Sequence, residues 1–208
     1  MIPQWGPLGI DELEKRLKQL PRRVVQTDPT QPRRAAVMLG LCSVDGIPSI
    51  LFTKRADDVP THKGQVSFPG GMEEPEDTGP VATALRETFE EVGLQPESIQ
   101  VLGLLHDVRA ITGVPVTPVL CYLGALDPSA LTIDPRETAA AFTLSVDDLC
   151  QTEHRHRVEY AHRGSYPVFE SGPWPVWGLT AVMVDEFLRE GMKWILWDEE
   201  GKPLKPKF

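Results

Sequence analysis

One short stretch of the sequence encodes a helix whose two ends are both specified. Gly79 gives the chain a permissive entry, Pro80 suits the first helical position, and Gly93 suits the residue just past the last turn. Between these ends, apolar positions recur at helical spacing and predict a face that packs on a core. That face consists of Val81, Leu85, Thr88 and Val92. The rest of the chain must therefore supply a hydrophobic surface on which this helix can lie.

Another face of the same helix carries three glutamates that break the local rules of helix stability. Glu87, Glu90 and Glu91 stand at i, i+3 and i+4, so their carboxylates lie together and repel one another. They also lie near the C-terminal end, where the helix dipole prefers cations, and Arg86 offsets only part of the repulsion. Such a cluster points to a functional site, because three carboxylates supply the hard oxygen ligands that Mg²⁺ or Mn²⁺ prefers. The alternative is a solvated acidic face.

Together with the residues before it, this helix resembles the Nudix box of the Nudix hydrolases. The matching positions are Gly71, Asp77, Arg86, Glu87, Glu90, Glu91, Gly93 and Leu94. Asp77 replaces a glutamate of the family consensus, eight residues instead of seven precede Arg86, and Thr88 fills a usually aliphatic place. The first two departures resemble the coenzyme A pyrophosphatase branch. The resemblance implies an α/β (α+β) fold, an α/β/α sandwich with a mixed sheet between helices.

The composition limits the partners of the protein. A chain of 208 residues, 41% of them hydrophobic, suits one well-cored domain with appendages. The formal net charge of −9 argues against a nucleic-acid partner, which would select a basic surface. An acidic protein that handles a polyanionic substrate needs local cations, and a carboxylate-bound metal ion would provide them.

The cysteines and the N-terminal residues bear on the compartment. Cys42, Cys121 and Cys150 are odd in number and lack metal-ligand spacing, so we expect free thiols in a reducing, intracellular compartment. No apolar run approaches the ~18 residues of a membrane helix, and the N-terminus lacks a signal-peptide core. Its acidic residues count against a mitochondrial presequence. The cytoplasm, the mitochondrion and the peroxisome stay open as locations.

The remaining pattern divides the chain into three parts. An amphipathic N-terminal helix has an apolar face of Ile10, Leu13, Leu17 and Leu20. Pro21 ends this helix, which we expect to pack on the body of the protein or on a partner. Residues 1–32 thus form a helix and a polar linker, residues 33–190 the Nudix-like domain, and residues 191–208 a tail.

Apolar runs and turn residues predict the other elements. Strands are predicted over residues 35–42, 49–55, 65–68, 99–108, 114–123 and 137–144, and a second hairpin over 155–163 and 166–169. Asp45–Gly46 is the turn between the first two strands. Ser145 caps a short helix, 146–150. A last helix, 178–189, has a predicted core face of Leu179, Val182, Met183 and Phe187.

Cations near the box suggest where a polyanionic substrate binds. The segments 51–56 and 62–71 resemble the second signature of coenzyme A pyrophosphatases, which ends in Phe-Pro-Gly-Gly. We assign Gly70 and Gly71 of that ending to the substrate site. Lys54, Arg55 and Lys63 place positive charges around a loop next to the acidic face, where phosphates can bind. The alternative is that these are ordinary surface cations.

The resemblance implies a metal-dependent pyrophosphohydrolase that splits coenzyme A or acyl-coenzyme A into 3′,5′-adenosine bisphosphate and 4′-phosphopantetheine or its acyl derivative. Glu87 and Glu91 are then metal ligands, and Glu90 is a third ligand or a carboxylate that orients water. Glu137 matches a recurrent glutamate of the family and is a candidate general base, and Arg86 completes the catalytic set. A hydrolase of ADP-ribose or nucleotide-sugars is the first alternative, and a catalytically silent binding module the second. A homodimer is compatible with the sequence.

Overall fold

The computed structural model describes residues 7–19, 21–30, 32–58, 62–160 and 164–191. In it, the first two strands of the central sheet form a tight hairpin. The hairpin joins β1 (Ala35–Val44) to β2 (Ile47–Arg55) through Asp45 and Gly46. Both turn residues have positive φ, 51° and 80°, as a type I′ turn requires. The predicted turn is confirmed, and both strands extend further toward it than the sequence indicated.

The sheet is mixed because its two longest strands run parallel. β7 (Pro115–Ala125) pairs with β1 in parallel, whereas the other pairings are antiparallel, and the main path has the order β3-β2-β1-β7-β5. The sheet has eight strands, and the remaining ones are β3 (Val66–Ser67), β4 (Gly70–Met72), β5 (Gln100–Leu104), β6 (Val108–Arg109) and β8 (Thr138–Ser145). β4 pairs with β1, β6 with β7, and β8 with β2. The strands predicted between residues 35 and 144 thus lie in one sheet, but the run 99–108 that was predicted as one strand is divided into β5 and β6.

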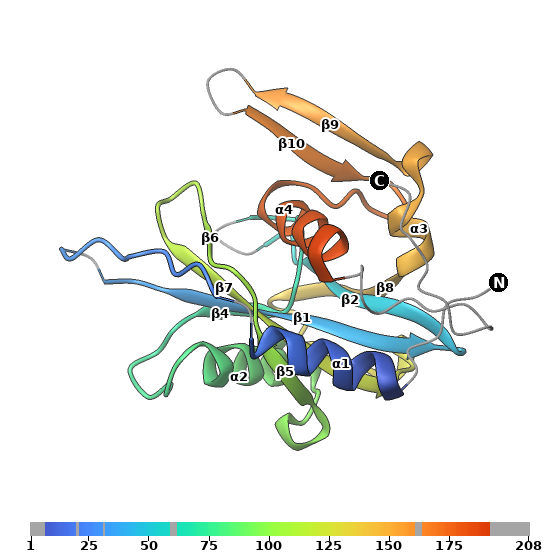
Figure 1. Ribbon diagram of the computed structural model, residues 1–208, viewed down its shortest axis with the longest axis horizontal. Helices are drawn as coiled ribbons and strands as arrows, with labels where there is room; N and C mark the ends of the chain where they lie inside the picture. Colours follow the sequence, from blue (N-terminus) through green and yellow to red (C-terminus); the bar gives the residue numbers. More distant parts are fainter. Residues whose placement is uncertain (1–6, 20, 31, 59–61, 161–163, 192–208) are drawn as a thin grey trace.

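Helices cover both faces of this sheet (Figure 1). On one face, α2 (Pro80–Val92) places Ala84 in a cluster with Met38 of β1. On the other face, Leu39 of β1 packs in a cluster with residues of α1 (Pro7–Leu17), α3 (Val146–Cys150) and α4 (Gly178–Glu186). The expected α/β/α sandwich is confirmed. Ser145 caps α3 by accepting a hydrogen bond from the Asp148 N–H at 3.0 Å.

The N-terminal helix packs on the body of its own chain. Ile10 and Leu13 are almost fully buried in the core cluster, and Leu17 packs against it. α1 ends at Leu17, which is earlier than predicted, and Leu20 lies outside the described residues. Three short 3₁₀ turns lie elsewhere in the described chain: Pro96–Ser98, Pro128–Ala130 and Thr152–His154. None of the described helices is long and apolar enough to cross a membrane.

The C-terminal helix is buried on more than the predicted face. Ala181 and Val184 are fully buried. Leu179 and Val182, which were predicted from the sequence to face the core, are only partly buried. The reason is a separate hairpin, β9 (Arg155–Tyr160) and β10 (Gly164–Phe169), which packs on α4 from the side away from the sheet (Figure 1). The last turn, Phe187–Gly191, is a π-helix. The tail from residue 192 onward lies outside the described residues.

Candidate active site

The ends of α2 fix the glutamates in space. Gly79 precedes the helix, Pro80 is its first residue, and Gly93 ends it in the left-handed conformation, φ 73°. The Gly93 N–H donates to the Phe89 carbonyl at 2.9 Å, as expected for a glycine just past a helix end. The predicted helix boundaries are therefore confirmed.

The three glutamates occupy three different environments. The side chain of Glu91 is 2% exposed and that of Glu87 is 14% exposed, whereas that of Glu90 is 54% exposed. Glu87 and Glu91 point inward between α2 and the strands, and Glu90 lies at the solvent edge with Arg86 Nη1 at 3.1 Å. A shared acidic face, as predicted from the spacing, thus resolves into a buried pair and one exposed carboxylate.

Glu91 is a buried carboxylate with incomplete partners. Arg55 Nη1 lies 3.4 Å from Glu91 Oε1, and the Gly70 backbone N–H also donates to this carboxylate. Burial raises the pKa of Glu91 to about 8; the Arg55 charge opposes this, and the charges of Glu87 and Glu137 add to it. Among the described residues, two buried side-chain atoms lack a hydrogen-bond partner, Glu91 Oε2 and Arg55 Nε. One is an acceptor and the other a donor, and they belong to the same ion pair.

Glu87 lies directly against the backbone of Gly71. A Cβ atom on Gly71 would come within 2.4 Å of Glu87 Oε1, so only glycine leaves room for this carboxylate. Burial raises the pKa of Glu87; Arg86 opposes the shift, and Glu90 and Glu137 reinforce it. Gly70 has φ 152°, and a Cβ there would be 2.4 Å from the Ala36 carbonyl oxygen. The structure thus gives both glycines a packing role beside the acids.

Arg86 ties the loop before α2 to the helix. Its guanidinium donates to both oxygens of Asp77, at 3.1 and 2.9 Å, and to the Met72 carbonyl at 3.1 Å. The same group reaches Glu87 at 3.0 Å. The hydrogen bond from Arg86 is the main cause that holds the pKa of Asp77 well below its usual range. Asp77, which the sequence singled out only as a departure from the box, thus forms an ion pair that holds Arg86 in place. We call this Asp77–Arg86 pair the brace.

The predicted cations separate on the two faces of the sheet. Successive side chains of a strand point to opposite faces, and Lys54 and Arg55 leave β2 on opposite sides. Arg55 reaches Glu91, whereas the Lys54 amino group lies 5.6 Å above the Trp174 ring and 3.8 Å from Asp57. Lys63 is exposed in the turn before β3. Of these three cations, Arg55 is the one that the described contacts bring to the acids.

This order of elements and this box are features of a known family. Comparisons with known proteins show whether the chain belongs to it. The sequence model of the NUDIX domain matches residues 31–169. The chain belongs to the Nudix family. It is 39% identical over 183 residues to the mitochondrial coenzyme A diphosphatase NUDT8 of Mus musculus, a match that covers 86% of this chain and 87% of that protein. The match to the Homo sapiens protein of the same name is 42% over 160 residues, covering 74% and 68%.

Among solved structures, a MutT/nudix family protein from Enterococcus faecalis has the same fold. It superposes with a TM-score of 0.51 at 14% identity, covering 88% of this chain and 70% of that protein. This likeness concerns the arrangement of helices and strands alone.

Glu137 lies within electrostatic range of the acids of the Nudix box. It is exposed, and it directly precedes β8. Its charge contributes to the raised pKa of both Glu87 and Glu91, which places it near the pair. The signal available in the sequence was a glutamate at the start of a predicted strand, and that strand, β8, pairs with β2, which also carries Arg55.

The residues present fit a divalent cation, although no group of three or more His, Cys, Asp or Glu side chains within the described ranges is assembled into a complete metal site. Glu91 Oε2 is buried without a partner, burial raises the pKa of both Glu87 and Glu91, and repulsion from the charges of Glu87 and Glu137 raises the pKa of Glu91 further. A hard cation would relieve this repulsion and take its remaining oxygen ligands from water or substrate. The exposed Glu90 remains a predicted third ligand.

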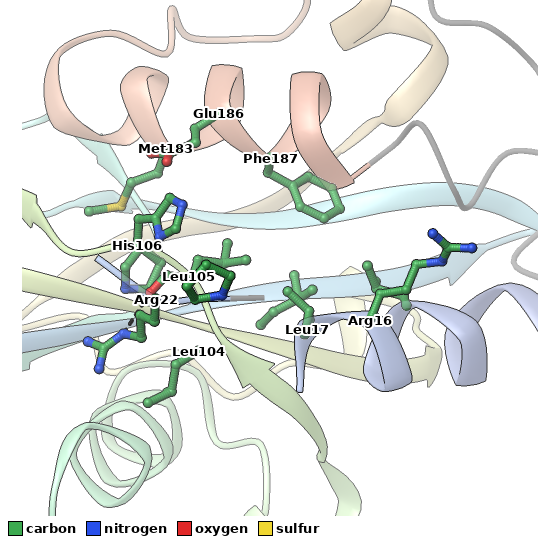
Figure 2. A pocket seen from close by; sticks show the side chains of 13 residues that line it. Arg16, Leu17, Arg22, Leu104, Leu105, His106, Met183, Glu186 and Phe187 are labelled. Atoms are coloured by element: carbon green, nitrogen blue, oxygen red, sulfur yellow. Dashed lines mark hydrogen bonds between the residues drawn. The ribbon is translucent and has the colours of Figure 1, made fainter. Parts of the chain in front are cut away.

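The apolar pocket in Figure 2 is a separate feature of this Nudix domain. It is a cavity of about 70 Å³ between α1, the end of β5 and α4. Leucines dominate its lining, with Met183 and Phe187 of the α4 region on one side. Leu13 and Leu120 in this lining belong to the core cluster on the face away from α2, so the pocket is not part of the acidic site.

Proposed function

We propose that this Nudix protein is a metal-dependent diphosphatase of coenzyme A and acyl-coenzyme A. Two observations support the substrate class: the relatives named coenzyme A diphosphatases match most of the chain, and the segment 51–56 resembles the second signature beside an elongated box. The observation that carries the chemistry is the buried Glu91, which contacts Arg55 and lies on the same helix face as Glu87. The relatives' mitochondrial location is a property of those proteins, and for this chain we propose a reducing compartment because its cysteines are free.

In the proposed reaction, water adds across the diphosphate. The water oxygen bonds to one phosphorus, the bond from that phosphorus to the bridging oxygen breaks, and the bridging oxygen leaves with the other phosphate. The products are 3′,5′-adenosine bisphosphate and 4′-phosphopantetheine, and the proton of the water passes to a base. When bound, a divalent cation supplies charge neutralisation and lowers the pKa of a bound water.

Separate side chains are assigned to metal binding, to positioning and to proton transfer. Glu87 and Glu91 would hold the cation, and Arg86 keeps Glu87 in place through its brace to Asp77. Glu137 is exposed beside the pair, so we assign it the role of base that accepts the proton from water. The expectation that Glu90 orients water keeps a geometric basis, because its carboxylate lies at the solvent edge of the same helix face.

Arg55 is suited to the phosphate itself. Its Nε–H is buried without a partner, while its Nη1 only touches Glu91 at 3.4 Å. A phosphate oxygen beside a cation on Glu91 would satisfy this donor with a charge-assisted hydrogen bond. The unpartnered Arg55 Nε–H thus matches the negative phosphate, and the unpartnered Glu91 Oε2 matches the positive metal ion. A metal-phosphate pair bound at this site would therefore satisfy both atoms at once.

A hydrolysis panel tests the proposal. Coenzyme A, acetyl-coenzyme A, ADP-ribose and a nucleotide-sugar are assayed with Mg²⁺ and then Mn²⁺, with the exposed Glu97→Gln as a matched control for Glu91→Gln. We expect the coenzyme A species to have the highest kcat/KM, Glu97→Gln to behave as wild type, and Glu91→Gln to lose most activity. Equal or faster turnover of ADP-ribose would overturn the coenzyme A assignment and leave the family assignment intact. Full activity of Glu91→Gln would overturn the proposed metal site.

A further inference from the structure

Three arginines meet one carboxylate where the β9–β10 hairpin packs on α4, outside the acidic site. Arg155 and Arg157 are two apart on β9, so both side chains point to the same face of the hairpin. Beneath them lies Asp185 of α4, and Arg189 stands one turn further along the same helical path. Arg155 hydrogen-bonds Asp185 Oδ1. Arg157 and Arg189 both approach Asp185 Oδ2, at 3.6 and 3.0 Å.

Among the described residues, the exposed part of this cluster carries more positive than negative charge. Arg157 and Arg189 share a single oxygen of Asp185. Burial lowers the pKa of Arg155, and the charges of Arg189 and Arg157 lower it further, which shows that the three guanidinium groups repel one another. The protein as a whole carries a formal charge of −9, so a concentration of positive charge is not a general property of its surface. Within the described residues, Asp185 is the acid that the three arginines share.

Docking the hairpin does not require all three arginines. Arg155, whose side chain is 14% exposed, already links β9 to α4 through Asp185, and it also lies 5.4 Å above the Phe169 ring. The other two side chains are about half exposed, 43% for Arg157 and 49% for Arg189. Arg157 is further oriented by Ser165, whose hydroxyl and carbonyl oxygens accept from it at 3.0 and 2.7 Å. Two half-exposed guanidinium groups that share one carboxylate oxygen bring several donors to one place, which suits a tetrahedral oxyanion.

We propose that Arg157 and Arg189, positioned by Asp185 and Ser165, form a binding site for a phosphate group outside the acidic site. The ligand is either free phosphate or a phosphate monoester of a nucleotide, since both present the same dianion. This site stands independently of the proposed diphosphatase activity. An anion there would neutralise the repulsion among the arginines and stabilise the contact between the hairpin and α4.

The experiment measures phosphate binding to the full chain by calorimetry and by thermal melts, in EDTA and at constant ionic strength. The test variant is Arg157→Gln/Arg189→Gln, and the matched control is Lys18→Gln/Arg109→Gln, which removes two exposed positive charges elsewhere. We expect wild type and control to bind phosphate and the test variant to bind at least about tenfold more weakly. Absence of binding to wild type, or equal binding by test and control variants, would overturn the proposal.

Two further arms sharpen the result. Replacement of the competing anion, Asp185→Asn, should tighten phosphate binding severalfold and make the melting temperature more dependent on phosphate. A purely structural ion-pair cluster predicts no such gain, so an unchanged phosphate affinity contradicts the proposed site. If Asp185→Asn does not fold, the single variant Arg189→Gln at the exposed edge decides between a phosphate site and a purely structural cluster. Finally, the affinity for 3′,5′-adenosine bisphosphate is compared with the affinity for phosphate. If the nucleotide binds more tightly to wild type, and this difference is lost in the Arg157→Gln/Arg189→Gln variant, the natural ligand of the site is a nucleotide. Equal affinities identify free phosphate.

Discussion

Replacing Glu91 by glutamine should make the metal-free protein less sensitive to alkaline pH. Glu91 is 2% exposed, and burial raises its pKa to about 8, well above the 4.5 of an ordinary glutamate. An acid whose pKa is raised on folding stabilises the fold most below its unfolded pKa, and this contribution is lost as pH rises through the folded value. In EDTA, wild type should therefore lose stability between pH 7 and pH 9.

The magnitude follows from the linkage relation. With a folded pKa of about 8 and an unfolded state that is ionised throughout, this pH step removes about 1.4 kcal/mol. For a chain of this size, that is a fall in Tm of about 3 to 6 °C. Glu91→Gln cannot ionise and should lack this part of the loss, whereas Glu97→Gln on an exposed 3₁₀ turn should retain it. At pH 7 the metal-free Tm of Glu91→Gln should equal or slightly exceed that of wild type.

Addition of metal separates the ligand role from burial alone. Mg²⁺ at about a hundred times its dissociation constant should stabilise wild type by roughly 2.7 kcal/mol, because the ion binds the folded state. This corresponds to a rise in Tm of roughly 5 to 10 °C, and Glu91→Gln should show little of it. Thermal melts at both pH values, with EDTA and with Mg²⁺, provide all the comparisons. Equal alkaline losses in the two proteins, or equal Mg²⁺ shifts with activity retained, would refute the reasoning.

Three further changes test other parts of the structure. Gly71→Ala should preserve the fold but weaken Mn²⁺ binding and hydrolysis at least about tenfold, because its Cβ would overlap the Glu87 carboxylate; calorimetry with Mn²⁺ measures this directly. Lys63→Ala should raise KM more than it lowers kcat if this cation binds a phosphate, and an unchanged KM removes Lys63 from the site. Asp107→Asn should destabilise the fold by about 3 kcal/mol, because it leaves two part-buried arginines without their acid. The pKa of Asp107 is lowered, since hydrogen bonds and charges outweigh its burial, so this difference should vanish as pH falls below the carboxyl range in acid melts.

Features set by neighbouring residues were predictable from the sequence. The Asp45–Gly46 turn, the boundaries of α2 and the Ser145 cap each depend on residues within one turn of the position concerned. Glycine at positive φ and a hydroxyl acceptor at a helix start act locally, so the chemistry of a few residues decides the backbone. The Nudix box belongs to the same class, because its spacing lies within one loop and one helix.

Features set by distant partners were not predictable. Asp107 is buried by Arg22, Arg34 and Thr117, which come from other segments of the chain, and no spacing in the sequence marks this cluster. The parallel pairing of β1 with β7 likewise joins strands about 80 residues apart. The same holds for Lys54: only the order of strands and the position of α4 show that it faces Trp174 rather than the acids.

The acidic site and its brace limit stability from opposite ends of the pH scale. Asp77 is held ionised by Arg86, so its lowered pKa contributes stability above the ordinary carboxyl range that is lost as pH falls. Glu91 acts in the opposite sense, since its contribution is lost as pH rises through about 8. Without metal, these two groups together should therefore give the greatest stability near about pH 4, with a continuous loss from there up to about pH 8. Bound cation would extend only the alkaline limit, because it compensates Glu91 and leaves the Asp77–Arg86 pair unchanged. A pH series of melts in EDTA and in Mg²⁺ tests this asymmetry, and an equal extension at both limits would show that metal stabilises the fold without engaging Glu91.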